Sequence, residues 1–89
     1  MHFVEKKIYK DVVLFREGDV GDSAFVLKGG EVELSTMIRD EKRVVAVLKP
    51  VSIFGEMAIF LPSHRRTLTA TVIRDAKIVE VSKAYFDVM

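Results

Sequence analysis

The chain has 89 residues, of which 49% are hydrophobic and 30% charged, with a formal net charge of +1 and no cysteine. A chain of this size forms one small domain, and this composition supports a hydrophobic core and excludes a disordered segment. The lack of cysteine excludes disulfides and thiolate metal sites, and the small net charge gives no broad field for nucleic acid.

The N-terminal quarter predicts two strands and a turn. Phe3–Tyr9 mixes apolar residues with lysines and predicts an edge strand, and the β-branched run Val12–Phe15 predicts a second strand. Arg16–Ser23 contains two Gly-Asp pairs, which are typical of a turn.

The next segments predict three further strands. A short apolar strand over Ala24–Leu27 is followed by Gly29-Gly30, which predicts a tight hairpin reversal. Glu31–Thr36 then alternates, so that its glutamates are expected outside and its apolar residues inside. The charged segment Met37–Lys42 predicts an exposed turn before a valine-rich strand over Arg43–Leu48.

The stretch after Pro50 mixes a strand stub with a short helix. Ile53-Phe54 predicts the stub, Glu56–Leu61 predicts about one and a half helical turns, and Pro62 ends them. No apolar run reaches the ~18 residues needed to span a membrane, and the N-terminus lacks a signal-peptide core. We therefore expect a cytoplasmic domain, or one at the cytoplasmic face of a membrane protein, that does not insert into the bilayer.

The C-terminal segments predict two last strands and the start of a helix. Leu68–Ile73 alternates threonine with apolar residues, Asp75-Ala76 predicts a turn, and Lys77–Val81 predicts the final strand. Ser82 is a suitable N-cap for a helix over Lys83–Met89. The whole chain thus predicts about eight short strands with turns about every 8–12 residues, which is typical of an antiparallel sandwich or small barrel.

One stretch, Ile53–Ala70, combines residue types suited to a phosphate attached to a ribose. Gly55 lets the backbone approach a ligand, and the helix that follows presents unpaired N–H groups at its N-terminus. Arg66 offers a planar fork for phosphate oxygens, whereas the carboxylate of Glu56 would repel them and is better placed on a sugar hydroxyl. The same residues also fit a strand end, a helix start and a solvated loop containing His64, Arg65 and Arg66.

Four segments, LFREGDVGDSAFVLKGGEVELS, VAVLKP, FGEMAIF and RRTLTATV, resemble a cyclic nucleotide-binding domain of cAMP receptor proteins, cyclic nucleotide-dependent kinases and gated channels. The resemblance covers roughly Tyr9 to Phe86. It implies a mainly β fold, an eight-stranded antiparallel jelly-roll β-barrel or double-stranded β-helix. A short phosphate-cassette helix and a truncated C-terminal helix would complete a single domain over residues 1–89.

The resemblance implies roles for individual residues. Glu56 would accept a hydrogen bond from the ribose 2′-hydroxyl, and Arg66 would pair with the cyclic phosphate. Asp22 would match the family's acidic residue that braces this arginine, although a turn residue that bonds its own loop fits equally well. The N–H groups that would cap the phosphate oxygens belong to Gly55, Met57 or Ala58, and to Thr67 or Leu68.

Other positions of the resemblance concern the base and the turns. The side chains of Val26, Leu48 and Val72 would line the base, or simply belong to the core. The glycines that match family turn glycines, with a backbone role and no ligand contact, are Gly18, Gly21 and Gly30.

The sequence departs from the family pattern in three places. Val51-Ser52 replaces a Gly-Asp pair, and Leu68 replaces an alanine near the phosphate. The chain ends at Met89, where family members continue into lid helices, so we expect a fragment with a more exposed base and weaker binding. Thr67 favours cGMP in the family's kinases, whereas cAMP is the commoner ligand of the family.

These observations predict a regulatory module that binds cAMP, or alternatively cGMP, and relays binding to an effector domain in the same parent chain or to a partner protein. The alternative is a degenerate jelly-roll domain that serves protein–protein interaction and binds no nucleotide. An enzyme is not expected, because the only histidines are His2 and His64 and no nucleophile–base arrangement is recognisable. We also expect no metal, no cofactor and no direct nucleic-acid binding by this segment.

Overall fold

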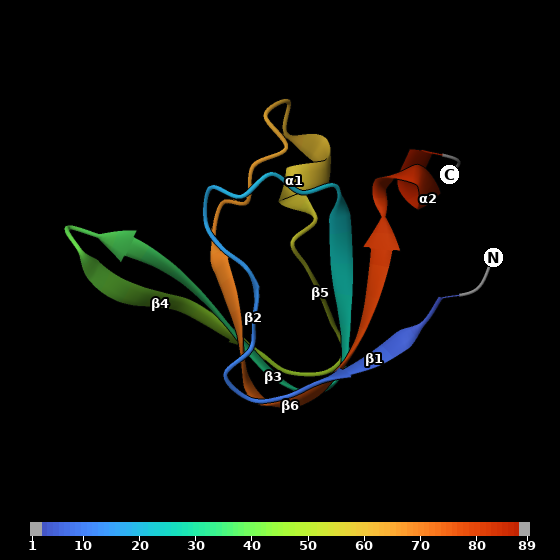
Figure 1. Cartoon of the computed structure of the whole chain (residues 1–89), viewed down its shortest axis with the longest axis horizontal. Coiled ribbons are helices and arrows are strands. Elements are labelled where there is room, and N and C mark those ends of the chain that lie inside the picture. Colours follow the sequence, from blue (N-terminus) through green and yellow to red (C-terminus); the bar gives the residue numbers. More distant parts are fainter. Residues whose placement is uncertain (1–2, 88–89) are drawn as a thin grey trace.

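The computed structural model describes residues 3–87, and it folds them into a single antiparallel sheet with two short helices (Figure 1). Neither helix of this part of the chain is long and apolar enough to cross a membrane. The elements are β1 Glu5–Ile8, β2 Val13–Phe15, β3 Ser23–Ile38, β4 Glu41–Leu48, β5 Ser52–Phe54, α1 Met57–Phe60, β6 Thr69–Ser82 and α2 Lys83–Asp87.

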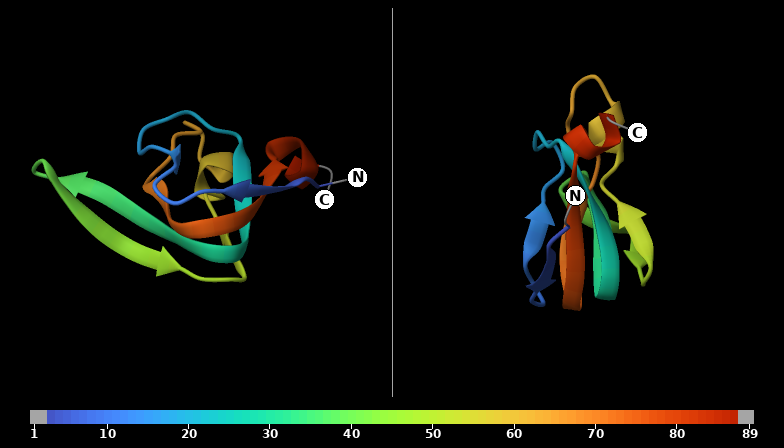
Figure 2. Two further views of the ribbon diagram at one scale, coloured as in Figure 1. Left: turned by 60° about the horizontal axis from the view of Figure 1, so that its bottom comes forward. Right: turned by 90° about the vertical axis from the view of Figure 1, so that its right-hand side faces the viewer.

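The two longest strands, β3 and β6, form the centre of the sheet and pair with each other from Ser23↔Ser82 to Ser35↔Thr69. β1 and β2 extend the sheet from β6, and β4 and β5 extend it from β3. Both central strands curve strongly, so the sheet folds over on itself into two arms, and α1 lies between the arms at their open end (Figures 1 and 2).

The structure corrects the predicted count of eight strands and the closed barrel. The predicted hairpin at Gly29-Gly30 is wrong, because β3 runs through it, and the predicted turn at Asp75-Ala76 is wrong, because β6 runs through it. Four predicted strands are therefore two long bent strands. The sheet of the described residues has six strands and is open.

Gly30 gives the physical reason for this difference. Its φ is +79°, and a Cβ atom there would lie 2.3 Å from the carbonyl oxygen of Asp75 on β6. The register between β3 and β6 shifts on either side of it, between Leu27 and Val32. The glycine therefore allows two bent strands to cross closely. A hairpin turn also favours glycine, so the sequence alone does not distinguish the two structures.

The other predicted strands are confirmed, with changed boundaries. The turn between β3 and β4 is shorter than expected and contains Arg39 and Asp40, with φ values of 51° and 63°. Positive φ at both central residues is the geometry of a tight hairpin. The C-terminal helix begins at Lys83, directly after Ser82, as predicted.

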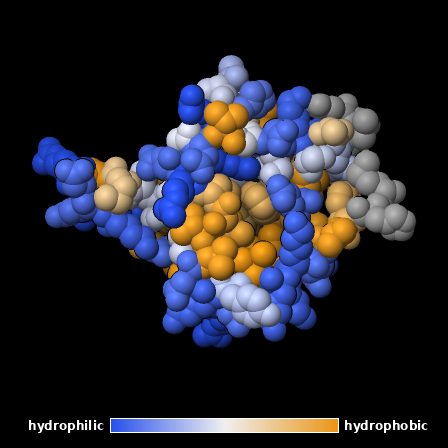
Figure 3. Space-filling model, viewed as in Figure 1, coloured by the Kyte–Doolittle hydropathy of each residue, from blue (hydrophilic) through white to orange (hydrophobic). Residues whose placement is uncertain are grey.

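The core fills the hollow between the arms of the sheet. Leu27, Val32 and Val72 are completely buried, and the rings of Phe15, Phe25 and Phe54 pack together with centroids 5.5–6.3 Å apart. Figure 3 shows apolar side chains gathered in this hollow and surrounded by hydrophilic ones. Glu33, expected outside, is only 8% exposed, and its carboxylate pairs with Lys42 at 2.9 Å.

Candidate functional site

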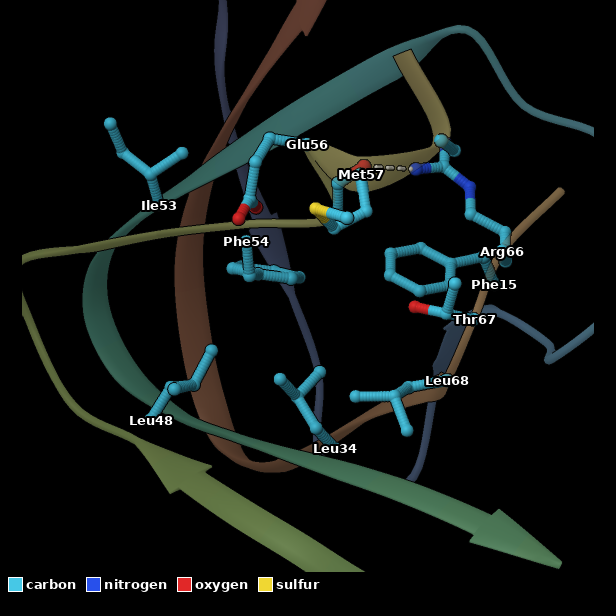
Figure 4. A pocket seen from close by; sticks show the side chains of 12 residues that line it. Phe15, Leu34, Leu48, Ile53, Phe54, Glu56, Met57, Arg66, Thr67 and Leu68 are labelled. Atoms are coloured by element: carbon cyan, nitrogen blue, oxygen red, sulfur yellow. Dashed lines mark hydrogen bonds between the residues drawn. The ribbon is translucent and has the colours of Figure 1, made fainter. Parts of the chain in front are cut away.

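A pocket of about 140 Å³ opens beside α1, where β5 ends and the segment leading into β6 begins (Figure 4). All seven residues predicted to bind the phosphate and the ribose line it. The complete lining consists of Phe15, Leu34, Leu48, Ile53, Phe54, Gly55, Glu56, Met57, Ala58, Arg66, Thr67 and Leu68.

Gly55 connects β5 to α1 with a φ of +78°, a conformation that favours glycine. A Cβ atom at this position would lie 3.1 Å from both the Phe15 ring and the Nη1 atom of Arg66. The glycine thus lets the backbone lie against the guanidinium. The N–H groups at the start of α1, those of Met57 and Ala58, have no acceptor within the helix.

Glu56 directly precedes α1, and its carbonyl accepts a hydrogen bond from the Ile59 N–H at 3.0 Å. Its carboxylate lines the pocket and makes no capping bond to the helix. Among residues 3–87 this carboxylate also has no other hydrogen bond or ion pair. An unpaired, half-buried carboxylate can accept hydrogen bonds from a ligand hydroxyl.

Arg66 precedes β6 and is only 6% exposed. Its Nη1 atom donates hydrogen bonds of 2.8 Å to the carbonyl oxygens of Ser23 and Gly55, the second of which is drawn in Figure 4. The guanidinium lies over the rings of Phe15 and Phe25, at 4.3 and 5.5 Å from their centroids. The side chain is therefore held by polar contacts at one end and by aromatic faces along its plane.

Burial lowers the pKa of Arg66 below its usual value, and the nearby carboxylates of Glu80, Asp22 and Asp19 oppose this shift. An arginine nevertheless stays protonated in proteins. The pocket therefore contains a desolvated positive charge next to apolar walls, where an anion is attracted more strongly than it is in water.

The structure does not place Asp22 as the direct brace of Arg66. No hydrogen bond or ion pair joins the Asp22 carboxylate to the guanidinium among the described residues, and its carbonyl accepts from the Lys83 N–H at 2.6 Å. The contact that sequence reasoning missed involves Ser23 and Glu80. The Arg66 Nη2 atom lies 3.4 Å from Ser23 Oγ, which donates to Glu80 Oε2 at 2.6 Å.

The predicted base-lining residues separate in the structure. Leu48 lines the pocket, whereas Val26 lines a different hollow, together with Val79 and Val81. Val72 is completely buried in the core and lines neither. The lining residues that sequence reasoning did not select are Phe15, Leu34, Ile53 and Phe54.

Gly21 has a role other than the expected one. Its φ is not in the positive region, and a Cβ atom there would lie 2.4 Å from Arg66 Nε. The residue therefore provides space for the guanidinium. Gly18 and Gly30 have positive φ values of 92° and 79°, which favour glycine, but Gly30 lies within β3 and not in the predicted turn.

The departures from the expected loop pattern fit the fold locally. Val51 has no positive φ, so this position does not require glycine here. Ser52 begins β5, and its hydroxyl donates a hydrogen bond to the carbonyl of Lys49 across the turn. Leu68 lines the pocket together with Leu34 and Leu48. No cluster of three or more potential metal ligands occurs among the residues that the structure describes.

A family model of the cyclic nucleotide-binding domain matches residues 5–89, so the chain belongs to this family. It is 30% identical over 71 residues to a CRP-like cAMP-activated global transcriptional regulator of Mycobacterium tuberculosis, an alignment that covers 79% of the chain and 31% of the regulator. The chain spans about a third of the length of the curated relatives it matches first.

Solved structures agree with this assignment. The regulatory domain of Toxoplasma gondii PKA in complex with cAMP is similar to this chain with a TM-score of 0.91 and 34% identity, over 97% of this chain and 33% of that one. The EAL enzyme Bd1971 is 30% identical in a cAMP-bound and a cGMP-bound form, with TM-scores of 0.83 and 0.85. These matches cover 90% and 91% of this chain and 22% of the enzyme.

Proposed function

We propose that this domain is a regulatory module that binds cAMP or cGMP and relays binding to an effector, either in the same parent chain or in a partner protein. The observation that supports this function best is the convergence of two opposite groups on one pocket. The buried guanidinium of Arg66 and the unpaired carboxylate of Glu56 both line it. A ligand that carries an anion next to hydroxyl groups satisfies both.

In the proposed complex, the cyclic phosphate lies between Arg66 and the start of α1. Its oxygens accept from the guanidinium and from N–H groups of the residues flanking it, and the ribose 2′-hydroxyl donates to Glu56. A phosphate oxygen that binds Arg66 Nη1 must replace one of its two carbonyl acceptors, because both protons of that atom are already used, and Gly55 is the acceptor that lines the pocket. The N–H groups proposed for this role belong to Gly55, Met57 or Ala58, and to Thr67 or Leu68.

The base is proposed to lie at the rim. A pocket of about 140 Å³ is smaller than the ~300–1,000 Å³ typical of sites that enclose a whole ligand, so it fits the sugar and phosphate. The side chains closest to the base would then be those of Leu48, Ile53 and Thr67, which line the same pocket.

The proposed relay uses the loop that contains Asp22. The carbonyl of Asp22 accepts a hydrogen bond from the N–H of Lys83, the first residue of α2. Ser23, which follows Asp22, accepts a hydrogen bond from Arg66. A ligand that binds Arg66 would therefore shift the population of arrangements of α2, which follows β6 directly. We propose no catalysis and no cofactor for this domain.

The first experiment is a calorimetric titration of the 89-residue chain with cAMP, cGMP and 5′-AMP. We expect saturable binding of a cyclic nucleotide and at least about tenfold weaker binding of 5′-AMP, because its phosphate carries more charge and a different shape. Absence of binding by both cyclic nucleotides would overturn the proposal and favour a domain that serves protein–protein interaction.

Glu56 provides a second test of the same pose. Glu56→Gln should weaken cAMP binding roughly tenfold and leave the affinity for 2′-deoxy-cAMP unchanged. Only cAMP has the 2′-hydroxyl that donates a hydrogen bond to the carboxylate. Glu41→Gln, at an exposed position of β4, is the matched control. An equal loss for both ligands would contradict the assignment of Glu56 to the ribose.

A further inference from the structure

Arg66 is connected to a carboxylate on another strand through one serine. Ser23 accepts from Arg66 twice, with its carbonyl at 2.8 Å and with its hydroxyl at 3.4 Å. The same hydroxyl donates to Glu80 Oε2 at 2.6 Å. Ser23 begins β3 and is 5% exposed, and Glu80 lies on β6, opposite Phe25.

The direction of these hydrogen bonds determines how the charge of Glu80 affects Arg66. Because the Ser23 proton points to Glu80, the hydroxyl oxygen presents its lone pairs to the guanidinium. A distance of 2.6 Å is typical of a charge-assisted O–H···O⁻ bond, and such a bond makes the serine oxygen a stronger acceptor. Through the Ser23 hydroxyl, the negative charge of Glu80 therefore stabilises the buried guanidinium of Arg66, although no direct ion pair joins the two side chains.

The two sides of the guanidinium differ in what a ligand can replace. Gly55 is part of the pocket wall, so its carbonyl competes with a phosphate for Nη1. Ser23 does not line the pocket, so a phosphate bound in the pocket can leave its contacts with Arg66 intact. Of the two carbonyl acceptors of Arg66 Nη1, the structure thus places only that of Gly55 in the pocket wall.

We propose that Ser23 and Glu80 are positioning residues that hold the Arg66 guanidinium in place for the ligand phosphate, an inference that rests on the proposed function. The other charged groups near Arg66, those of Asp22 and Asp19, make no hydrogen bond or ion pair with it among the described residues. Lys6, which lies on the same hollow of the surface as Glu80, makes no ion pair with that carboxylate within this part of the chain.

The experiment compares isosteric variants in calorimetric titrations with cAMP. Glu80→Gln and Ser23→Ala should each weaken binding about tenfold, since each removes a charge-assisted or polar contact that aligns the arginine. Ser82→Ala, which lies opposite Ser23 in the register, and Glu5→Gln, on the edge strand, should change affinity less than about twofold. Thermal unfolding of each variant shows whether the fold is retained.

A double-mutant cycle separates positioning from a general structural role. In an Arg66→Lys background, which lacks the Nη atoms, Glu80→Gln should cause no further loss of cAMP affinity. A readout without ligand is the solvent exchange of the Arg66 Nη protons. These protons should exchange at least about tenfold faster in Glu80→Gln than in the parent chain, because a hydrogen-bonded acceptor has been weakened.

The outcomes distinguish this inference from the proposed function. If the parent chain binds no cyclic nucleotide, the proposed function fails, and faster Arg66 exchange in Glu80→Gln would still show the contact. If the parent chain binds and Glu80→Gln and Ser23→Ala bind equally well, positioning by these residues is wrong while the function stands. Additive losses in the double-mutant cycle would also overturn it.

Discussion

At the residue scale, two adjacent arginines have opposite environments. Arg65 is exposed and its Nη1 donates to the carbonyl of Gly18, whereas Arg66 is buried against Phe15 and lines the pocket. Arg66→Ala should lower cAMP affinity by about 30- to 700-fold, which corresponds to ~2–4 kcal/mol for a lost charge-assisted phosphate contact. Arg65→Ala should change it less than about twofold. Calorimetric titration measures both, and similar losses would contradict the assignment of the phosphate to Arg66.

Leu48 and Val72, which were both expected to line the base, should now behave differently. Val72 is completely buried, so Val72→Ala should lower the free energy of unfolding by about 1–3 kcal/mol through the cavity it leaves. Leu48 is partly buried and lines the pocket, so Leu48→Ala should mainly weaken nucleotide binding. Urea unfolding and titration of both variants separate these effects. A stable Val72→Ala variant with lost affinity would restore the original interpretation.

The sequence predicts the pocket residues that lie within one contiguous motif, because the turn and the helix that place them are local. Glu56, Arg66 and their neighbours belong to this group. Glu80 and Gly21 could not be predicted, because their proximity to Arg66 depends on the register between β3 and β6 and on the loop that precedes β3. No local pattern in the sequence specifies that register.

At the element scale, the bend in the two central strands depends on Gly30. Gly30→Ala should lower the free energy of unfolding by about 2–4 kcal/mol, because its Cβ would overlap the Asp75 carbonyl and its φ is +79°. Gly29→Ala is the control, since its Cβ would meet only the Lys77 side chain at 3.6 Å. Chemical denaturation measures both. Equal stability of the two variants would show that the crossing does not require glycine at residue 30.

The wrong hairpin prediction at the same place has a clear physical origin. A pair of glycines between two apolar runs is a strong local pattern for a reversal. The chain continues instead because β6 pairs with both halves of β3, from Ser23 to Ser35. Pairing with the distant strand β6 therefore determines that these glycines lie in a bent strand and not in a hairpin turn. A short segment of sequence does not contain this information.

At the scale of the whole molecule, the size of the pocket limits how well the domain can distinguish bases. In the proposed complex only the sugar and phosphate lie within the pocket of about 140 Å³, so cAMP and cGMP should bind the 89-residue chain with affinities that differ less than about tenfold. Thr67 is exposed at the pocket rim, and Thr67→Ala should weaken cGMP about two- to fivefold while leaving cAMP unchanged. Competition titrations test this. A preference above a hundredfold would show that the base is enclosed.

The central pairing of β3 with β6 also has a consequence for how the chain reaches its structure. Ser23 pairs with Ser82, so segments that are far apart in the sequence must come together before the central pair of strands, β3 and β6, is complete. Within residues 3–87, the outer strands β1, β2, β4 and β5 pair only with these two strands, and a two-stranded pair is at best marginally stable by itself. Closing so long a loop for non-local contacts makes folding slow, on the order of milliseconds to seconds. The pocket beside α1 combines residues of β2, β3, β4 and β5 with the segment that precedes β6, so it is completed late in folding.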